Sequence, residues 1–156
     1  MTAPPPLSHA DSEITRSAAD AFASAFDAND YGAFASMLTE DCELIAPEHA
    51  VRGATRVAEV FRAAAAWAQR AFDECRHESV VARFDGEQAE LEITSYLMRV
   101  PGRWHRFRRT RRLTVERDGR IASITDVADD ATRAEFRVFV DACGAPPAPL
   151  AFGAGG

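Results

Sequence analysis

The sequence contains no lysine, so all 18 of its basic residues are arginine. We interpret this as compositional bias, because no single site requires it along the whole chain. Cysteine is scarce as well: Cys42, Cys75 and Cys143 are far apart, and no two of them have the Cys-x-x-Cys spacing. An odd number of widely spaced cysteines argues against a disulfide framework and against a thiolate metal site. A reducing, cytoplasmic compartment is therefore expected.

Long apolar runs are also absent. The longest, residues 63–68, is far too short to span a bilayer, and the N-terminal residues lack the basic start and apolar stretch of a signal peptide. The net charge of -6 argues against a general nucleic-acid partner. Four scattered histidines without carboxylates at ligand spacing predict no metal site, and no phosphate-binding glycine loop or dinucleotide fingerprint is found. We therefore expect no cofactor.

The length and composition fit one globular domain. With 156 residues, 47% hydrophobic and 27% charged, the chain can bury a core of ordinary size. Residues 1–11 are rich in proline, and residues 144–156 are mostly glycine, proline and alanine. Such segments bury little, so we expect two flexible tails around a domain of residues 12–143.

Helical periodicity marks the first half of this domain. A helix over residues 12–28 is predicted by apolar residues at every fourth position, namely Ile14, Ala18, Phe22 and Phe26. Asn29 can end this helix in a left-handed conformation. A short second helix around Phe34 leads into the apolar strand of residues 42–46. After a loop over residues 48–53, Thr55 is expected to cap a third helix, with Phe61 and Trp67 on its apolar side.

Strand patterns fill the second half. Three turns, Asp85–Gly86, Pro101–Gly102 and Asp118–Gly119, separate long β-patterned runs, and Asp129 or Asp130 is expected to cap a last helix. Turns rather than crossovers connect these strands, so we predict an α+β fold with an antiparallel sheet and not a βαβ fold.

The hairpin of residues 104–130 places chemistry inside this fold. Alternation puts Arg109, Arg111 and Leu113 on one face of its first arm, and Ile124 and Asp126 on one face of its second. A carboxylate among apolar neighbours is either a structural group, paired with backbone donors or with an arginine such as Arg111, or an acid with a raised pKa available for proton transfer. Both interpretations remain open.

Three segments of the sequence resemble segments of one protein family. NDYGAFASMLTEDCELIAP resembles its helix-turn-helix-strand opening, RGATRVAEVF its third helix, and DGRIASITDVADD its last two strands. The chain, over residues 12–142, is thus similar to the SnoaL-like and ketosteroid-isomerase-like branch of the nuclear-transport-factor-like superfamily. The resemblance implies a cystatin-like α+β barrel: a curved, cone-shaped antiparallel sheet wrapped around three N-terminal helices, with a short C-terminal helix.

The resemblance also implies site residues. Where ketosteroid isomerases carry a tyrosine and two aspartates, this chain has Phe22, Ala46 and Arg111. SnoaL-like cyclases use an aspartate as acid and base in an apolar pocket, often near a histidine, and Asp126 and His105 match those roles. The residues expected to bind the substrate line the same cone: Phe22, Phe26, Phe61, Trp67, Arg111, Leu113, Ile124 and, in a loop at its opening, His49.

Two functions follow from this set. The first is a pocket protein that binds a hydrophobic, carbonyl-bearing small molecule, with a cofactor-free cyclase, isomerase or dehydratase reaction at Asp126. The alternative is a non-catalytic ligand-binding or dimerisation module in which Asp126 pairs with Arg111. In either case a homodimer is expected through the outer sheet face that carries Thr94, Tyr96 and Met98.

Overall fold

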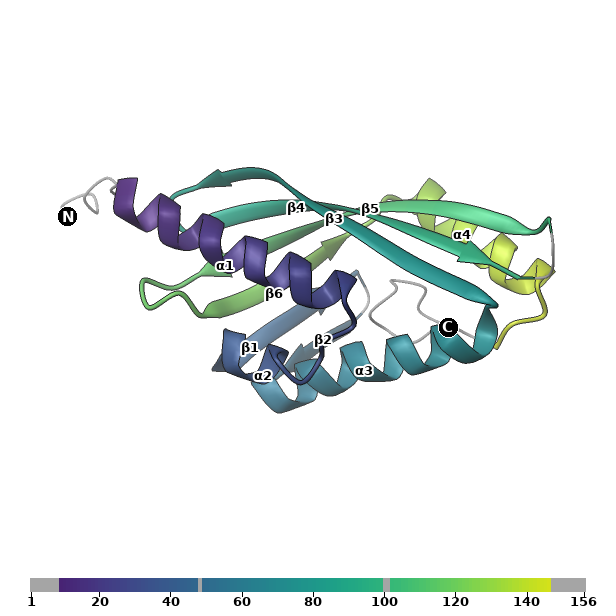
Figure 1. The fold of residues 1–156 in the computed structure, drawn as a ribbon, viewed down its shortest axis with the longest axis horizontal. Helices are drawn as coiled ribbons and strands as arrows, with labels where there is room; N and C mark the ends of the chain where they lie inside the picture. The colour runs from purple at the N-terminus through teal and green to yellow at the C-terminus, as the bar shows by residue number, and fades with distance from the viewer. Residues whose placement is uncertain (1–8, 48, 100–101, 147–156) are drawn as a thin grey trace.

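The computed structural model describes residues 9–47, 49–99 and 102–146. Both predicted tails therefore lie largely outside the described residues, and so does Pro101 of the predicted second turn. Figure 1 shows the ten elements in chain order: α1 (His9–Asp27), α2 (Phe34–Met37), β1 (Leu38–Ala46), β2 (His49–Arg52), α3 (Ala54–Ala71), β3 (Glu74–Asp85), β4 (Gln88–Met98), β5 (Trp104–Val115), β6 (Ile121–Val127) and α4 (Asp130–Ala142).

The six strands form one sheet in the order β2-β1-β6-β5-β4-β3. All neighbours are antiparallel except β1 and β6, which pair in parallel, so the sheet is mixed rather than wholly antiparallel as the sequence suggested. A tight turn forces two strands to run antiparallel, but β1 and β6 are joined only through the rest of the chain and escape that constraint. The predicted α+β architecture is otherwise confirmed.

Local signals explain most element ends. Asn29 adopts a left-handed φ of 57° after α1, as predicted, and the Asp129 carboxylate caps α4 by accepting from Thr132 N at 2.6 Å. Two expectations needed correction. Gly53, with a φ of 110°, occupies the cap position of α3 instead of Thr55, and residues 49–52 of the predicted loop form β2.

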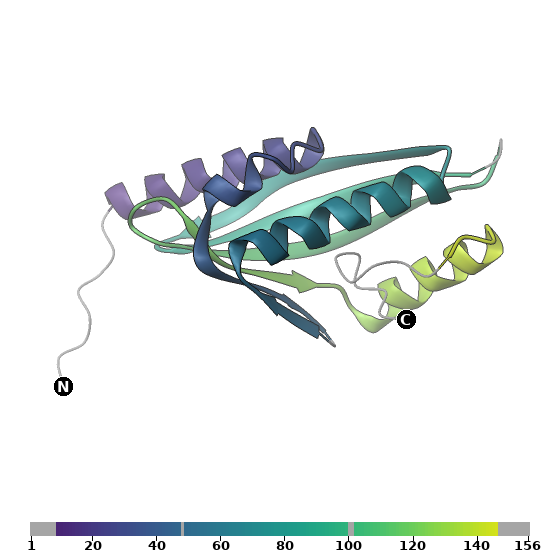
Figure 2. The same ribbon diagram turned by 90° about the horizontal axis from the view of Figure 1, so that it is seen from below.

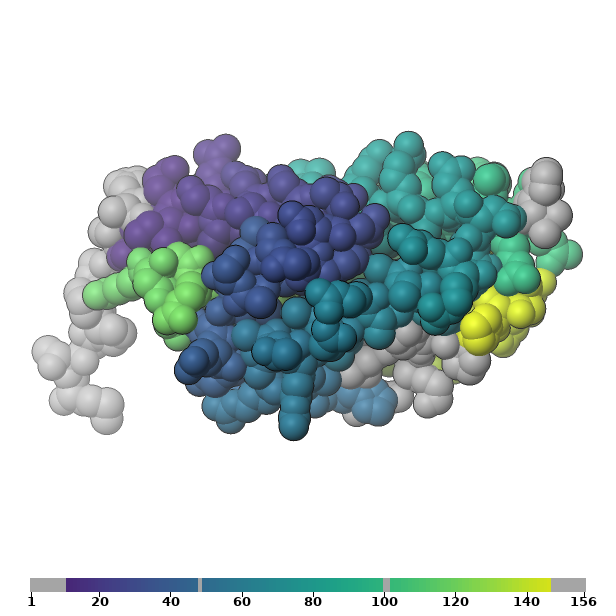
Figure 3. Space-filling model, turned by 60° about the horizontal axis from the view of Figure 1, so that its bottom comes forward, coloured from purple at the N-terminus to yellow at the C-terminus, as the bar shows by residue number. Residues whose placement is uncertain are grey.

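The helices cover one face of the sheet. Figures 1 and 2 show α1 and α3 crossing this face, and α4 lying beside its far end; Figure 3 shows the covered side with α1 in purple. Ring contacts join helix to helix and helix to sheet. Phe22 of α1 stacks on Phe34 of α2 with 4.9 Å between ring centroids, and Phe107 of β5 meets Phe136 of α4, also at 4.9 Å. We call this helix-covered side the inner face. None of the described helices combines the length and the apolar content needed to cross a bilayer.

Candidate functional site

A buried ion pair lies on the inner face where β5 meets β6. Arg111 and Asp126 are directly opposite each other in the antiparallel register. The Arg111 Nε atom donates to Asp126 Oδ1 at 2.5 Å and Nη2 to Oδ2 at 3.4 Å. The side chains are 0% and 3% exposed. The period of two that placed both residues inside the fold is therefore confirmed, and the guanidinium engages both carboxylate oxygens.

Aromatic rings enclose the arginine of this pair. The guanidinium carbon of Arg111 lies 4.7 Å from the ring centroid of Phe26 on α1 and 4.9 Å from that of Phe61 on α3. Cation–π attraction to two rings stabilises a charge that burial would otherwise disfavour. One donor is left over: within the described residues, Arg111 Nη1 is buried and has no hydrogen-bond partner. Two helices and the sheet thus hold a guanidinium with unused capacity.

A second arginine points to the inner face of the sheet. Arg109 precedes Arg111 by two residues on β5 and is only 5% exposed. Burial and the adjacent charge of Arg111 lower the pKa of Arg109 to about 9, although Asp126 acts in the opposite direction. At neutral pH its guanidinium therefore remains charged inside the fold.

Neutral polar groups complete the site. His77 on β3 faces Ser95 on β4, with Nδ1 and Oγ 2.8 Å apart, and the Cys75 Sγ atom lies 3.7 Å from His77 Nε2. Burial, reinforced by the charges of Arg109 and Arg111, lowers the pKa of His77 to about 3. We call the whole set the interior cluster: Tyr31, Cys75, His77, Ser95, Arg109, Arg111 and Asp126.

Tyr31, His77 and Ser95 are not among the site residues that the sequence predicts. The Asp85–Gly86 turn alone would pair His77 with Tyr96, but an irregularity between Val81 and Arg83 shifts the β3–β4 register by one residue and brings His77 opposite Ser95. The sequence pattern does not reveal this shift. Tyr31 follows α1, and its hydroxyl donates to Asn29 Oδ1 at 2.8 Å. No strand periodicity marks such a position.

The predicted histidines lie away from the cluster. His105 shares the inner face, but six residues of β5 separate it from Arg111, about 20 Å at the usual strand rise. Its ring instead stacks on Phe139 of α4 at 5.2 Å, and burial lowers its pKa. His49 is exposed on the edge strand β2. The structure therefore does not bring either histidine to Asp126.

The predicted apolar wall is buried as expected, in two groups. Phe26 and Phe61 touch Arg111, as described, and Phe22 packs on Phe61 with 6.0 Å between centroids. Trp67 lies near α4 instead, where its ring meets Phe136. The remaining two positions, Leu113 and Ile124, are paired across β5 and β6 and fully buried.

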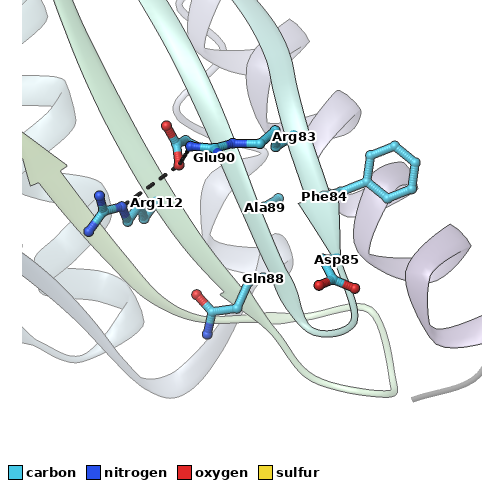
Figure 4. A pocket seen from close by; sticks show the side chains of 7 residues that line it. All are labelled: Arg83, Phe84, Asp85, Gln88, Ala89, Glu90 and Arg112. Atoms are coloured by element: carbon cyan, nitrogen blue, oxygen red, sulfur yellow. Dashed lines mark hydrogen bonds and ion pairs between the residues drawn. The ribbon is translucent and has the colours of Figure 1, made fainter. Parts of the chain in front are cut away.

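The outer face of the sheet, opposite the helices, carries a groove that is open to solvent. The residues that line it lie on β3, β4 and β5 (Figure 4), and its volume is about 470 Å³. Both Arg83 and Arg112 approach the same Glu90 carboxylate oxygen, at 3.1 and 3.9 Å, and both arginine side chains are more than half exposed. Solvated pairs of this kind are weak. No metal-binding group of three or more His, Cys, Asp or Glu side chains occurs among the described residues.

Comparison with known structures places the chain in a class. It is similar to a LEH-like epoxide hydrolase from M. tuberculosis (22% identity, 83% of this chain and 92% of that chain, TM-score 0.61). It is also similar to TerC co-crystallised with polyporic acid, with 17% identity, 82% of this chain and 98% of that chain covered, and a TM-score of 0.65. An NTF2-like protein of unknown function from Exiguobacterium sp. 255-15 has 17% identity, with 72% of this chain and 98% of that chain covered, and a TM-score of 0.56. The fold is therefore NTF2-like, as predicted.

The family follows from the sequence match. The model of the SnoaL-like domain matches residues 19–124, which is more than half of the chain, and the chain belongs to this family. The comparison with curated proteins gives no significant match.

Proposed function

We propose that this chain binds a hydrophobic, carbonyl-bearing small molecule against the interior cluster. The observation that carries the proposal is Arg111, which is wholly buried between two rings and keeps Nη1 without a hydrogen-bond partner among the described residues. Leaving a buried donor unsatisfied costs about 1–3 kcal/mol. A ligand oxygen that accepts from Nη1 would recover this cost, and Phe26 and Phe61 would contact the apolar body of the ligand.

Asp126 has a positioning role in this proposal. Because both of its oxygens face Arg111 nitrogen atoms, the carboxylate fixes the plane of the guanidinium and therefore the direction of Nη1. This arrangement favours the binding module over acid–base chemistry, since a carboxylate engaged in a forked pair is less available to a substrate proton.

A second candidate function keeps Asp126 as an acid and base in a cofactor-free cyclase, isomerase or dehydratase reaction. The observation that favours it is the burial of the carboxylate, which leaves it largely out of contact with water. Its test is Asp126→Asn, which would lower turnover roughly 10²-fold or more if the acid transfers a proton. His105 would have no part in that step, given its distance along β5.

The oligomer we propose is a homodimer in the cytoplasm, formed through the outer sheet face. Thr94, Tyr96 and Met98 point to this face of β4 and are half-buried in the single chain. Arginines on β5 and glutamates on β4 alternate across it, as in the pair Arg108–Glu92, so a second copy can meet opposite charges. Light scattering should give twice the 17.0 kDa of the chain; a monomer at micromolar concentration would contradict the dimer.

Matched ligands test the binding function. In naphthalene and phenanthrene series, the acetyl compound should raise the melting temperature of the full chain, and the ethyl hydrocarbon of the same shape should raise it less. The double variant Arg111→Met/Asp126→Leu, which removes both charges of the pair, should lose this preference. If the ketones and the hydrocarbons stabilise the protein equally, the proposed function is wrong.

A further inference from the structure

Ser95 interrupts an apolar face of β4. The other inward-facing residues of this strand are apolar and buried: Ala89, Leu91, Ile93 and Leu97. Ser95 is 0% exposed, so its hydroxyl group has no contact with water. A buried hydroxyl destabilises the fold unless it forms hydrogen bonds, and an apolar residue at this position would avoid that cost. The hydroxyl therefore calls for polar partners.

His77 supplies one such partner and leaves capacity over. In the part of the chain that the structure describes, His77 Nδ1 is the one group within hydrogen-bonding distance of Ser95 Oγ, at 2.8 Å. A hydroxyl group can donate once and accept twice. The contact with His77 holds the Ser95 side chain in place, and at least one further hydrogen bond can still be made by its oxygen or its proton.

The tautomer of His77 decides which hydrogen bond Ser95 can offer. The imidazole is neutral at pH 7, because burial lowers the pKa of His77 to about 3. If Ser95 donates to Nδ1, its oxygen can accept a further bond, and if Nδ1 donates to Ser95, the serine proton can be donated elsewhere. A ligand hydroxyl, which both donates and accepts, fits either arrangement.

The pair of His77 and Ser95 lies at a distance from Arg111 along the sheet. Leu91 of β4 is paired with Arg111 of β5, and Ser95 lies four residues farther along β4, about 13 Å at the usual strand rise. The ring of Phe26 contacts both sides: its centroid is 4.6 Å from that of His77 and 4.7 Å from the guanidinium carbon of Arg111. An apolar ligand that packs on Phe26 would therefore meet a polar group near each end.

We propose that Ser95, oriented by His77, is a second ligand-binding residue of the interior cluster, and that it binds a hydroxyl group at the end of the ligand opposite the carbonyl. This inference rests on the proposed function and narrows the ligand to an apolar, ring-containing hydroxyketone. Arg111 Nη1 would donate to the ketone oxygen, and Ser95 would exchange a hydrogen bond with the hydroxyl.

Ser95→Ala tests this role with a minimal change, since it removes one oxygen atom and leaves Arg111, Asp126 and Phe26 in place. The matched control is Ser36→Ala, the same substitution at an exposed position of α2, where the hydroxyl donates to Ala33 O at 2.9 Å. If Ser95→Ala does not fold, the double variant Ser95→Ala/His77→Leu, which replaces the whole pair by apolar side chains, takes its place.

The experiment is calorimetric titration of the full chain at pH 7 with two pairs of ketones of matched size. It compares 6-hydroxy-2-acetylnaphthalene with its 6-methyl analogue, and 7-hydroxy-2-acetylphenanthrene with its 7-methyl analogue. The hydroxyketone of at least one pair should bind roughly 10-fold more tightly, the value of one well-formed hydrogen bond. Ser95→Ala should reduce this ratio to below about 3, whereas Ser36→Ala should leave it unchanged.

Each other outcome overturns the inference. If the hydroxy and methyl ketones bind equally, and both bind more tightly than the ethyl hydrocarbon, the inference is wrong and the proposed function stands. A hydroxyl preference that persists in Ser95→Ala also overturns it, as does an equal loss in Ser36→Ala. If no compound of either series binds, the inference and the proposed function fall together.

Discussion

The two faces of β5 carry the same residue type in opposite settings. Arg106, Arg108 and Arg112 point outward and are exposed, whereas Arg109 and Arg111 point inward and are buried. On the outer face, Arg108 lies 3.9 Å from Glu92 and Arg112 lies 3.9 Å from Glu90, both in water. On the inner face, Arg111 contacts Asp126 at 2.5 Å with neither side chain open to solvent.

Position on the strand, and not residue type, therefore decides what an arginine contributes to stability. In water, attraction and side-chain entropy nearly cancel, so an exposed pair contributes about 0–1 kcal/mol. Inside the fold the desolvation cost has already been incurred by both partners, so removing one partner leaves the other charge uncompensated and costs about 3–5 kcal/mol. Substitutions on the two faces test this contrast.

The largest effect is expected for Asp126→Asn. The amide keeps the shape of the side chain but leaves the Arg111 guanidinium without a counter-charge, so the free energy of unfolding should fall by on the order of 3 kcal/mol. Urea unfolding at pH 7 measures it. The control is Asp118→Asn, which alters an exposed pair with Arg120 in the β5–β6 turn and should leave the transition midpoint near that of the wild type. A stable Asp126→Asn protein would contradict the structural role of the pair.

A smaller loss is expected when both charges are removed together. Arg111→Met/Asp126→Leu replaces a buried pair by apolar side chains, which is often close to neutral for stability. The double variant should therefore unfold at a higher urea concentration than Arg111→Met alone, with a coupling of about 2 kcal/mol or more between the two sites. Additive losses would mean that the two charges do not stabilise each other.

The sequence predicted the inner face of the hairpin well. A strict period of two over residues 107–115 indicated which side chains enter the fold, and Arg111 and Asp126 do lie inside it. The register that sets these two residues opposite each other includes an irregularity between Thr114 and Val115, which the Asp118–Gly119 turn does not predict. The same reasoning recognised the fold, because helix stops and turns such as Asn29 and Gly119 impose local geometry that tertiary contacts do not override.

Which of the inward-facing side chains meet in the interior cluster depends on distances that periodicity does not encode. His105 satisfied the pattern as well as Arg109 did, but it lies near the other end of a 12-residue strand. His77 belongs to a different hairpin and reaches the cluster only through the order of strands β5, β4 and β3. The partners of Arg111 on the helices, Phe26 and Phe61, had been assigned correctly to the interior, but their contact with a guanidinium requires the packing of α1 and α3.

His77 makes the inner face sensitive to acid. At pH 7 the side chain is neutral in both states. Below its ordinary pKa of 6.5 the unfolded chain takes up a proton that the folded protein accepts only near pH 3, so stability should fall as the pH decreases through this window. Between pH 7 and pH 4.5 the wild type should lose about 2 kcal/mol more than His77→Gln. The exposed His49→Gln is the matched control, and identical pH profiles for all three proteins would contradict the burial of a neutral His77.

The smallest effect is expected for Arg108→Gln. Arg108 is the neighbour of Arg109 on β5, and its side chain points to the outer face. The Arg108 side chain is 63% exposed, and its partner Glu92 is 53% exposed. Solvent screens such a pair, so the free energy of unfolding should change by less than about 0.5 kcal/mol, and 0.5 M salt should remove even that difference. Unfolding is measured at two protein concentrations, because an outer face covered by a second copy would no longer be solvated. A loss above about 1 kcal/mol that grows with protein concentration would therefore show that the contrast between the two faces holds only for the single chain, and that the outer arginines are buried in the dimer.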